Sequence, residues 1–107
     1  MTYCIFCKIA AGEIPAEKVY EDDDVVAFHD IRPIAPVHFM IIPKRHVDSL
    51  QQCSDEHQAL LGKIMLLAPK LAQEQGMSTG FKLGVNTGAG GGQEVFHLHV
   101  HVYGHKA

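Results

Sequence analysis

The chain has 107 residues, of which 47% are hydrophobic and 20% are charged, and its formal net charge is −3 at pH 7. This length and composition predict one soluble globular domain over residues 1–107. The negative charge and the lack of a basic run argue against nucleic acid as the main partner. No apolar run approaches the length of a membrane span, and no signal-peptide pattern opens the chain, so we expect a cytoplasmic protein.

Glycines, prolines and the spacing of apolar residues divide the chain into short elements. We expect, in order, a knuckle and short helix over 4–12, strands over 18–21, 25–31 and 37–43, a long helix from Ser54 to Gly76, and strands over 81–86 and 95–103. Pro69 should kink or split the long helix. The pattern predicts an α+β domain with a mostly antiparallel sheet. The apolar stripe of the long helix comprises Leu61, Ile64, Met65, Ala68, Leu71 and Ala72.

Three histidines alternate with apolar residues in the last predicted strand: His97, His99 and His101. Successive side chains of a strand point to opposite faces, so the three imidazoles should project from one face while the residues between them enter the core. The chemistry open to such a row is metal ligation, proton transfer, anion binding or nucleophilic attack.

A glycine-rich loop over 87–94 runs directly into this strand. Glycine lets backbone N–H groups approach an anion closely, and Gln93 adds a side-chain donor. Many such loops are only hairpin turns, but beside the imidazole row this one predicts a phosphate cradle. One imidazole could then attack phosphorus while a second neutralises charge or protonates the leaving group. Such chemistry requires no metal.

The chain resembles the histidine triad (HIT) family over nearly its whole length, and most of all the Hint branch, in the bacterial type that carries an N-terminal Cys-x-x-Cys. This resemblance implies a HIT-like fold, with a sheet continuous across a homodimer. It also implies hydrolysis of the P–N bond of purine nucleoside 5′-phosphoramidates. The segments that carry it are Cys4-Ile-Phe-Cys-Lys-Ile, Glu13-Ile-Pro-Ala, Val25-Val-Ala-Phe-His-Asp-Ile, the run from His38 to His46, Asn86-Thr-Gly, and Gly-Gly-Gln before the histidine row.

The resemblance also implies a role for each matching residue. His99 corresponds to the nucleophile that attacks the α-phosphorus, His101 to the residue that contacts the phosphate and assists the leaving group, and His38 to the one that orients the nucleophile's ring. His97, first of the triad, completes the catalytic set, and Asp30 accepts from the ribose hydroxyls. The apolar walls around base and sugar are Phe6, Ile9, Phe28 and Ile31, and the phosphate-side contacts are Asn86, Gly92 and Gln93.

Cys4 and Cys7 have the spacing of a zinc knuckle, which needs two further ligands to close a tetrahedral site. The resemblance to bacterial HIT proteins, and to the related galactose-1-phosphate uridylyltransferases, implies that His46 and His97 complete it. The zinc would be structural. A redox pair and two unrelated thiols are the competing interpretations.

The sequence departs from the animal Hint pattern at two places. Glu94 stands where a small hydroxyl residue is common, and the chain stops three residues after Gly104, without the tail that reaches a partner's site. Leaving-group preference therefore does not transfer. Three alternatives stay open: a hydrolase with a catalytic zinc on the three histidines, a non-enzymatic nucleotide-binding or interaction module, and a dinucleoside polyphosphate hydrolase of the same family.

Overall fold

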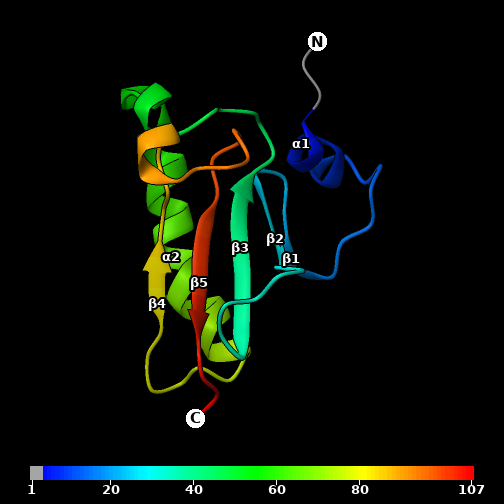
Figure 1. The fold of residues 1–107 in the computed structure, drawn as a ribbon, viewed down its shortest axis with the longest axis vertical. Helices are drawn as coiled ribbons and strands as arrows, with labels where there is room; N and C mark the ends of the chain where they lie inside the picture. The colour runs from blue at the N-terminus through cyan, green and yellow to red at the C-terminus, as the bar shows by residue number, and fades with distance from the viewer. Residues whose placement is uncertain (1–3) are drawn as a thin grey trace.

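The computed structural model describes residues 4–107, which form an α+β fold on a five-stranded antiparallel sheet (Figure 1). The strand order is β1-β2-β3-β5-β4, so β3 is central and β4 is an edge. The strands are β1 (Lys18–Glu21), β2 (Val25–His29), β3 (Val37–Pro43), β4 (Lys82–Gly84) and β5 (Val100–Gly104). The helical elements are α1 (Ile5–Ala10), α2 (Gln58–Glu74) and three 3-10 turns, η1 (Leu50–Gln52), η2 (Asp55–His57) and η3 (Ala89–Gly91).

The alternation of side chains along β3 gives the two faces of the sheet different neighbours. Phe39 and Ile41 belong to the larger hydrophobic core, which α2 covers. Met40 and Ile42 point to the opposite face and belong to a second core with Phe6 of α1. All of β3 is buried, as expected for a central strand with both faces covered. The two faces of the sheet are thus covered by different elements, one by α2 and the other by α1.

The long helical segment begins after Ser54 and ends before Gly76, as predicted, although its first turn is the 3-10 turn η2. Gly76 has a φ of 93°, a conformation that favours glycine and terminates the helix. Pro69 does not split α2. Proline has no N–H to donate to the Met65 carbonyl, but Pro69 and Met65 both lie on the exposed side of the helix. Met65 is thus 45% exposed, and Leu67 is buried in the stripe instead. Among residues 4–107, neither α-helix has the length and apolar character that a membrane crossing requires.

Three strands are shorter than predicted, and hydrogen bonds outside the sheet redirect the backbone in two of them. β2 ends before Asp30, whose carboxylate accepts a hydrogen bond from the Arg32 amide at 2.8 Å and starts a turn. β4 pairs with β5 over only three positions. β5 begins at Val100, because the Leu98 amide donates to the Val47 carbonyl at 2.8 Å, outside the sheet. The first two histidines of the row therefore precede β5.

Candidate functional site

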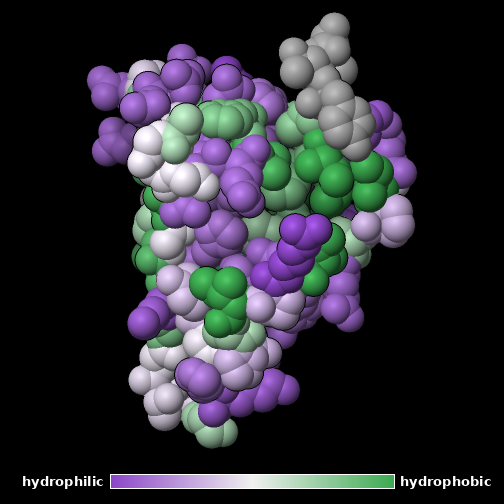
Figure 2. Space-filling model, viewed as in Figure 1, coloured by the Kyte–Doolittle hydropathy of each residue, from purple (hydrophilic) through white to green (hydrophobic). Residues whose placement is uncertain are grey.

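A pocket of about 710 Å³ opens on the α1 face of the sheet, a size suited to a small-molecule ligand. His38 of β3 and His101 of β5 point to this face, and His99 joins them from just before β5. Figure 2 shows apolar side chains gathered towards the α1 end of this side of the molecule. The predicted residues that line the pocket are Phe6, Ile9, Phe28, Asp30, Ile31, His38, Asn86, Gly92, His99 and His101.

Two apolar residues of the pocket wall are unusually exposed. Ile31 is 93% and Ile34 is 72% exposed, although both line the pocket. They lie in the turn that follows β2, next to Asp30. A planar apolar ligand seated in the pocket would cover them, and covering apolar surface is favourable.

His99 is held in one tautomer by the backbone. Its Nδ1 lies 2.8 Å from the carbonyl oxygen of His97, which only accepts, so Nδ1 carries the proton and Nε2 keeps a free lone pair. The ring is 6% exposed and meets Phe6 edge to face, with ring centroids 5.2 Å apart. This is the arrangement of an imidazole prepared for attack through Nε2. The expectation that His38 orients this ring is wrong, because the His97 carbonyl does so.

His38 instead fixes the tautomer of His101. The Ile34 amide donates to Nδ1 of His38 at 3.2 Å, so in the neutral pair Nε2 of His38 carries the proton and donates it to Nδ1 of His101 at 2.9 Å. Nε2 of His101 is then the protonated nitrogen. Burial, with the charges of His99 and His38, lowers the pKa of His101 to about 4, and Asp30 opposes that shift. Burial also lowers the pKa of His38, whose Nε2 lies 3.5 Å from Asp30.

Gln93 does not present its amide to the pocket, in contrast to the expected phosphate contact. Its Oε1 accepts from the Gly88 amide at 2.8 Å, and its Nε2 donates to the carbonyl oxygens of Asp48 at 2.7 Å and Val95 at 3.0 Å. The side chain is buried. Both ends of the amide are thus used to hold the glycine-rich loop, and the residues of the loop that line the pocket are Gly92 and Glu94.

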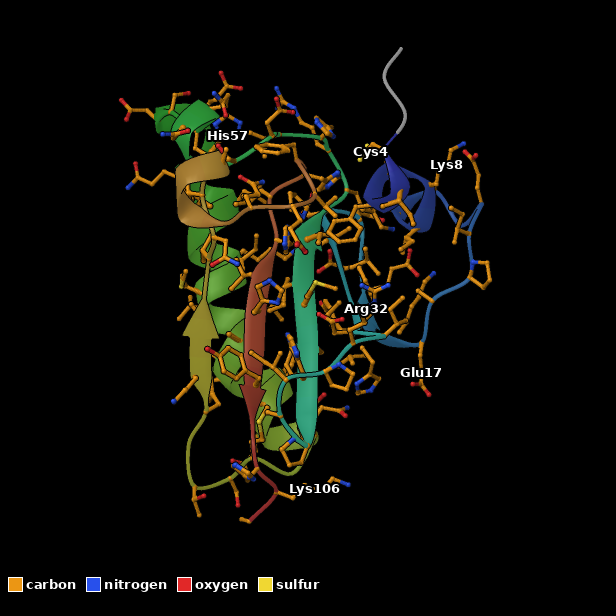
Figure 3. The ribbon with its side chains drawn as sticks, viewed as in Figure 1. Cys4, Lys8, Glu17, Arg32, His57 and Lys106 are labelled. Carbon is orange, nitrogen blue, oxygen red and sulfur yellow. The ribbon has the colours of Figure 1, made fainter. Side chains whose placement is uncertain are left out.

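Four potential metal ligands meet beside the pocket, and we call them the Cys/His cluster: Cys4, Cys7, His46 and His97. Figure 3 shows Cys4 at the start of α1, close to the end of β3. Nδ1 of His97 lies 3.3 Å from Sγ of Cys4 and 3.5 Å from Sγ of Cys7, and Nδ1 of His46 lies 3.2 Å from Sγ of Cys7. The ligand bond lengths of zinc give tetrahedron edges of about 3.3–3.8 Å. The cluster therefore fits a tetrahedral zinc ion.

The outer hydrogen bonds of the Cys/His cluster support the same conclusion. Nε2 of His97 lies 2.7 Å from the Pro43 carbonyl, and Nε2 of His46 lies 2.6 Å from Oδ1 of Asp48. Because both partners accept, each Nδ1 has a bare lone pair, and the two Nδ1 atoms lie 3.2 Å apart. Carbonyl and carboxylate partners of this kind orient histidine ligands in zinc sites. Burial and the neighbouring Cys4 raise the pKa of Cys7 to about 11, a bias that a divalent cation would reverse.

His97 thus belongs to the Cys/His cluster, and its ring does not line the pocket as the predicted catalytic row required. A second group, Asp30, His38 and His101, also brings three ligand atoms within 4.8 Å of one another. His38 has no lone pair to spare there, because one nitrogen accepts from Ile34 and the other donates to His101. The arrangement disfavours the alternative in which the three histidines of the row hold a catalytic zinc.

Comparison with known proteins decides the family. A family profile described as "Scavenger mRNA decapping enzyme C-term binding" matches residues 3–107. The sequence is 60% identical over 104 residues to "Protein HitA" of Neisseria gonorrhoeae, with 97% of each chain covered. The chain belongs to the histidine triad (HIT) family.

Solved HIT structures agree with the fold, and one of them is described as zinc-bound. A HIT family hydrolase from Legionella pneumophila is 48% identical and superimposes with a TM-score of 0.94, covering 98% of this chain and 95% of that one. A zinc-bound histidine triad family protein from Mycobacterium smegmatis is 34% identical, with a TM-score of 0.82 over 96% of this chain and 75% of that one. The predicted HIT-like α+β fold is confirmed.

Proposed function

We propose that this HIT hydrolase cleaves the P–N bond of purine nucleoside 5′-phosphoramidates through a nucleotidyl-His99 intermediate. The observation that carries the proposal is the tautomer of His99, whose free Nε2 lone pair belongs to a ring lining the pocket. Phe6, Ile9 and Phe28 offer apolar walls for the purine and its sugar, and Ile31 is an exposed surface for the base to cover. Asp30 is the acceptor for the ribose hydroxyls.

The reaction proceeds in two displacements. Nε2 of His99 attacks the α-phosphorus, and the P–N bond of the substrate breaks as the new P–N bond to His99 forms. The departing amine takes a proton from Nε2 of His101. The negative charges of the bound phosphate and of Asp30 favour the protonated form of His101 that donates this proton. Water then attacks phosphorus and gives a proton to His101, and the P–N bond to His99 breaks as the new P–O bond forms, which releases the mononucleotide and the free His99. The loop borders the phosphate at Gly92, whose own N–H donates to the Ala89 carbonyl within the loop.

The Cys/His cluster would hold a structural zinc ion in this proposal. Cys4, Cys7, His46 and His97 are its ligands, and bound zinc would supply rigidity to the segment that carries the His97 carbonyl. His97 contributes to the reaction only through its backbone carbonyl, which orients the ring of His99.

We further propose a homodimer whose sheet continues across β4. β4 is an edge strand, and Leu83 on it is 36% exposed. Figure 1 shows α2 behind this side of the sheet, and Leu66 of α2 is 78% exposed. Open strand edges and exposed apolar side chains commonly form such interfaces. A single species with the monomer mass in sedimentation equilibrium would contradict the dimer.

The covalent intermediate is the decisive test of the function. The protein is mixed with the butylamide of adenosine 5′-monophosphate, quenched within milliseconds to seconds, and analysed by intact-mass and peptide spectrometry. We expect an adenylyl adduct on the peptide that contains His99 and release of AMP, and neither with His99→Ala. Equal AMP release by wild type and His99→Ala would refute the mechanism, and no release by the wild type would refute the function.

A further inference from the structure

We propose that Glu94 selects the leaving group of this reaction, so that phosphoramidates whose departing amine carries a positive charge are preferred over those whose amine carries a negative charge. The inference rests on the proposed function and adds a specificity-determining residue to it. Glu94 lines the same pocket as His99 and His101.

The backbone at Glu94 is fixed from both sides. Gln93, which precedes it, is buried and holds the backbone at Gly88, Asp48 and Val95 through three hydrogen bonds. The segment then continues to Leu98, which is anchored on the Val47 carbonyl. The Glu94 side chain is exposed while it borders the pocket. A carboxylate on a fixed backbone at this position presents its charge to whatever occupies the adjoining space.

Among residues 4–107, no ion pair compensates the charge of Glu94. Apart from histidines, the charged residues that line the pocket are Glu17, Asp30, Arg32 and Glu94, three acids and one base. Asp30 is engaged with the Arg32 amide and lies next to His38. The pocket is thus poorly suited to a leaving group with several negative charges.

Glu94 is placed near the leaving group of the proposed reaction and not near the nucleoside. Glu17 precedes β1 and Arg32 follows β2, and Figure 3 shows both on the α1 side of β3, where the apolar walls for base and sugar lie. Glu94 instead follows Gly92, the part of the loop assigned to the phosphate, and leads into the segment of His99. The group that departs from phosphorus therefore leaves next to Glu94. Across several ångströms of partly hydrated space, one unit charge changes a rate by a factor of several.

The test compares three AMP amides that share one type of P–N bond and differ in the far end of the amine. The amines are 1,4-diaminobutane, with a cationic end, butylamine, with a neutral end, and 4-aminobutyrate, with an anionic end. The measured quantity is kcat/KM for the cationic amide divided by kcat/KM for the anionic amide. Glu94→Gln removes the charge and keeps the shape. Glu17→Gln removes a carboxylate from the other wall, and Glu74→Gln makes the same change of net charge outside the pocket.

We expect the wild-type ratio to be on the order of tenfold at low ionic strength and to fall as potassium chloride is added. Glu94→Gln should bring the ratio to within about twofold of one, while Glu17→Gln and Glu74→Gln keep the wild-type ratio. An unchanged ratio in Glu94→Gln, with a wild-type thermal unfolding midpoint, would overturn the inference. Failure of the wild type to cleave any of the three amides would instead overturn the proposed function, so the two failures are distinguishable.

Discussion

The carbonyl oxygen of His97 lies 2.8 Å from Nδ1 of His99, while the ring of His97 lies among Cys4, Cys7 and His46. One residue therefore joins the Cys/His cluster to the candidate nucleophile through its own backbone. Any change in the cluster that moves this backbone also moves the hydrogen bond that orients His99. The cluster and the pocket are consequently expected to respond together.

The first prediction concerns metal content. Wild-type protein purified without chelator should contain about one zinc ion per chain, and Cys4→Ser should lower both the zinc content and the thermal unfolding midpoint, the latter by about 5 °C or more. Cys53→Ser is the matched control, because the Cys53 thiol donates to the Ser49 carbonyl away from the cluster. Elemental analysis and thermal unfolding measure both. Equal zinc in the two variants would exclude Cys4 as a ligand.

The second prediction concerns stability in acid. The pKa of His101 is about 4 in the folded protein, against an ordinary value of 6.5, so between these values the unfolded chain binds a proton that the folded chain does not. Stability should therefore fall as the pH drops from 6.5 towards 4, and His101 should account for about 2–3 kcal/mol of that loss. Urea unfolding at pH 7 and pH 4.5 measures it. His101→Gln should lose less on acidification than the wild type, whereas His105→Gln, at an exposed site, should lose as much.

The third prediction concerns the anchor of the glycine-rich loop. Gln93→Leu leaves the Gly88 amide and the Asp48 and Val95 carbonyls without their partner. We expect a loss of about 1–3 kcal/mol in the free energy of unfolding, with a higher KM for AMP amides because the loop is no longer held. Gln73→Leu, at an exposed site on α2, is the control for both quantities. Wild-type KM in a folded Gln93→Leu protein would show that the loop needs no such anchor.

The fourth prediction compares two glycines of that loop. Gly92 has a φ of 81°, whereas Gly90 does not have a positive φ, and an added Cβ meets no atom within 4 Å at either position. Gly92→Ala should therefore cost about 1–2 kcal/mol in the free energy of unfolding through backbone strain alone, and Gly90→Ala should be close to neutral. Chemical unfolding of the two variants measures the difference. Equal stabilities would mean that the loop changes conformation to accept the alanine.

Much of the fold could be predicted from the sequence because hydrophobic spacing and end signals agree locally, as in the helical segment formed by η2 and α2, which begins after Ser54 and ends before Gly76. The first part of the predicted last strand was wrong, because strict alternation cannot reveal that the Leu98 amide pairs with Val47 outside the sheet. A contact between residues so far apart in the chain has no local signature.

The candidate site shows the same limit. Ten of the 23 residues that line the pocket were predicted, because they lie in segments that carry motif signals. The partners of His99 and His101 were not predictable, because they depend on which nitrogen meets a carbonyl or another ring. Gln93 was assigned to the ligand because a side-chain amide next to glycines has the same signature whether it binds phosphate or its own backbone.

The exposed wall of the pocket has a thermodynamic consequence. Ile31 and Ile34 present apolar surface to water while the pocket is empty. A nucleotide that covers them removes this surface from hydration, and the heat capacity of the system should then decrease on binding. Titration calorimetry with AMP at several temperatures would therefore detect occupancy even in a His99→Ala protein that performs no chemistry.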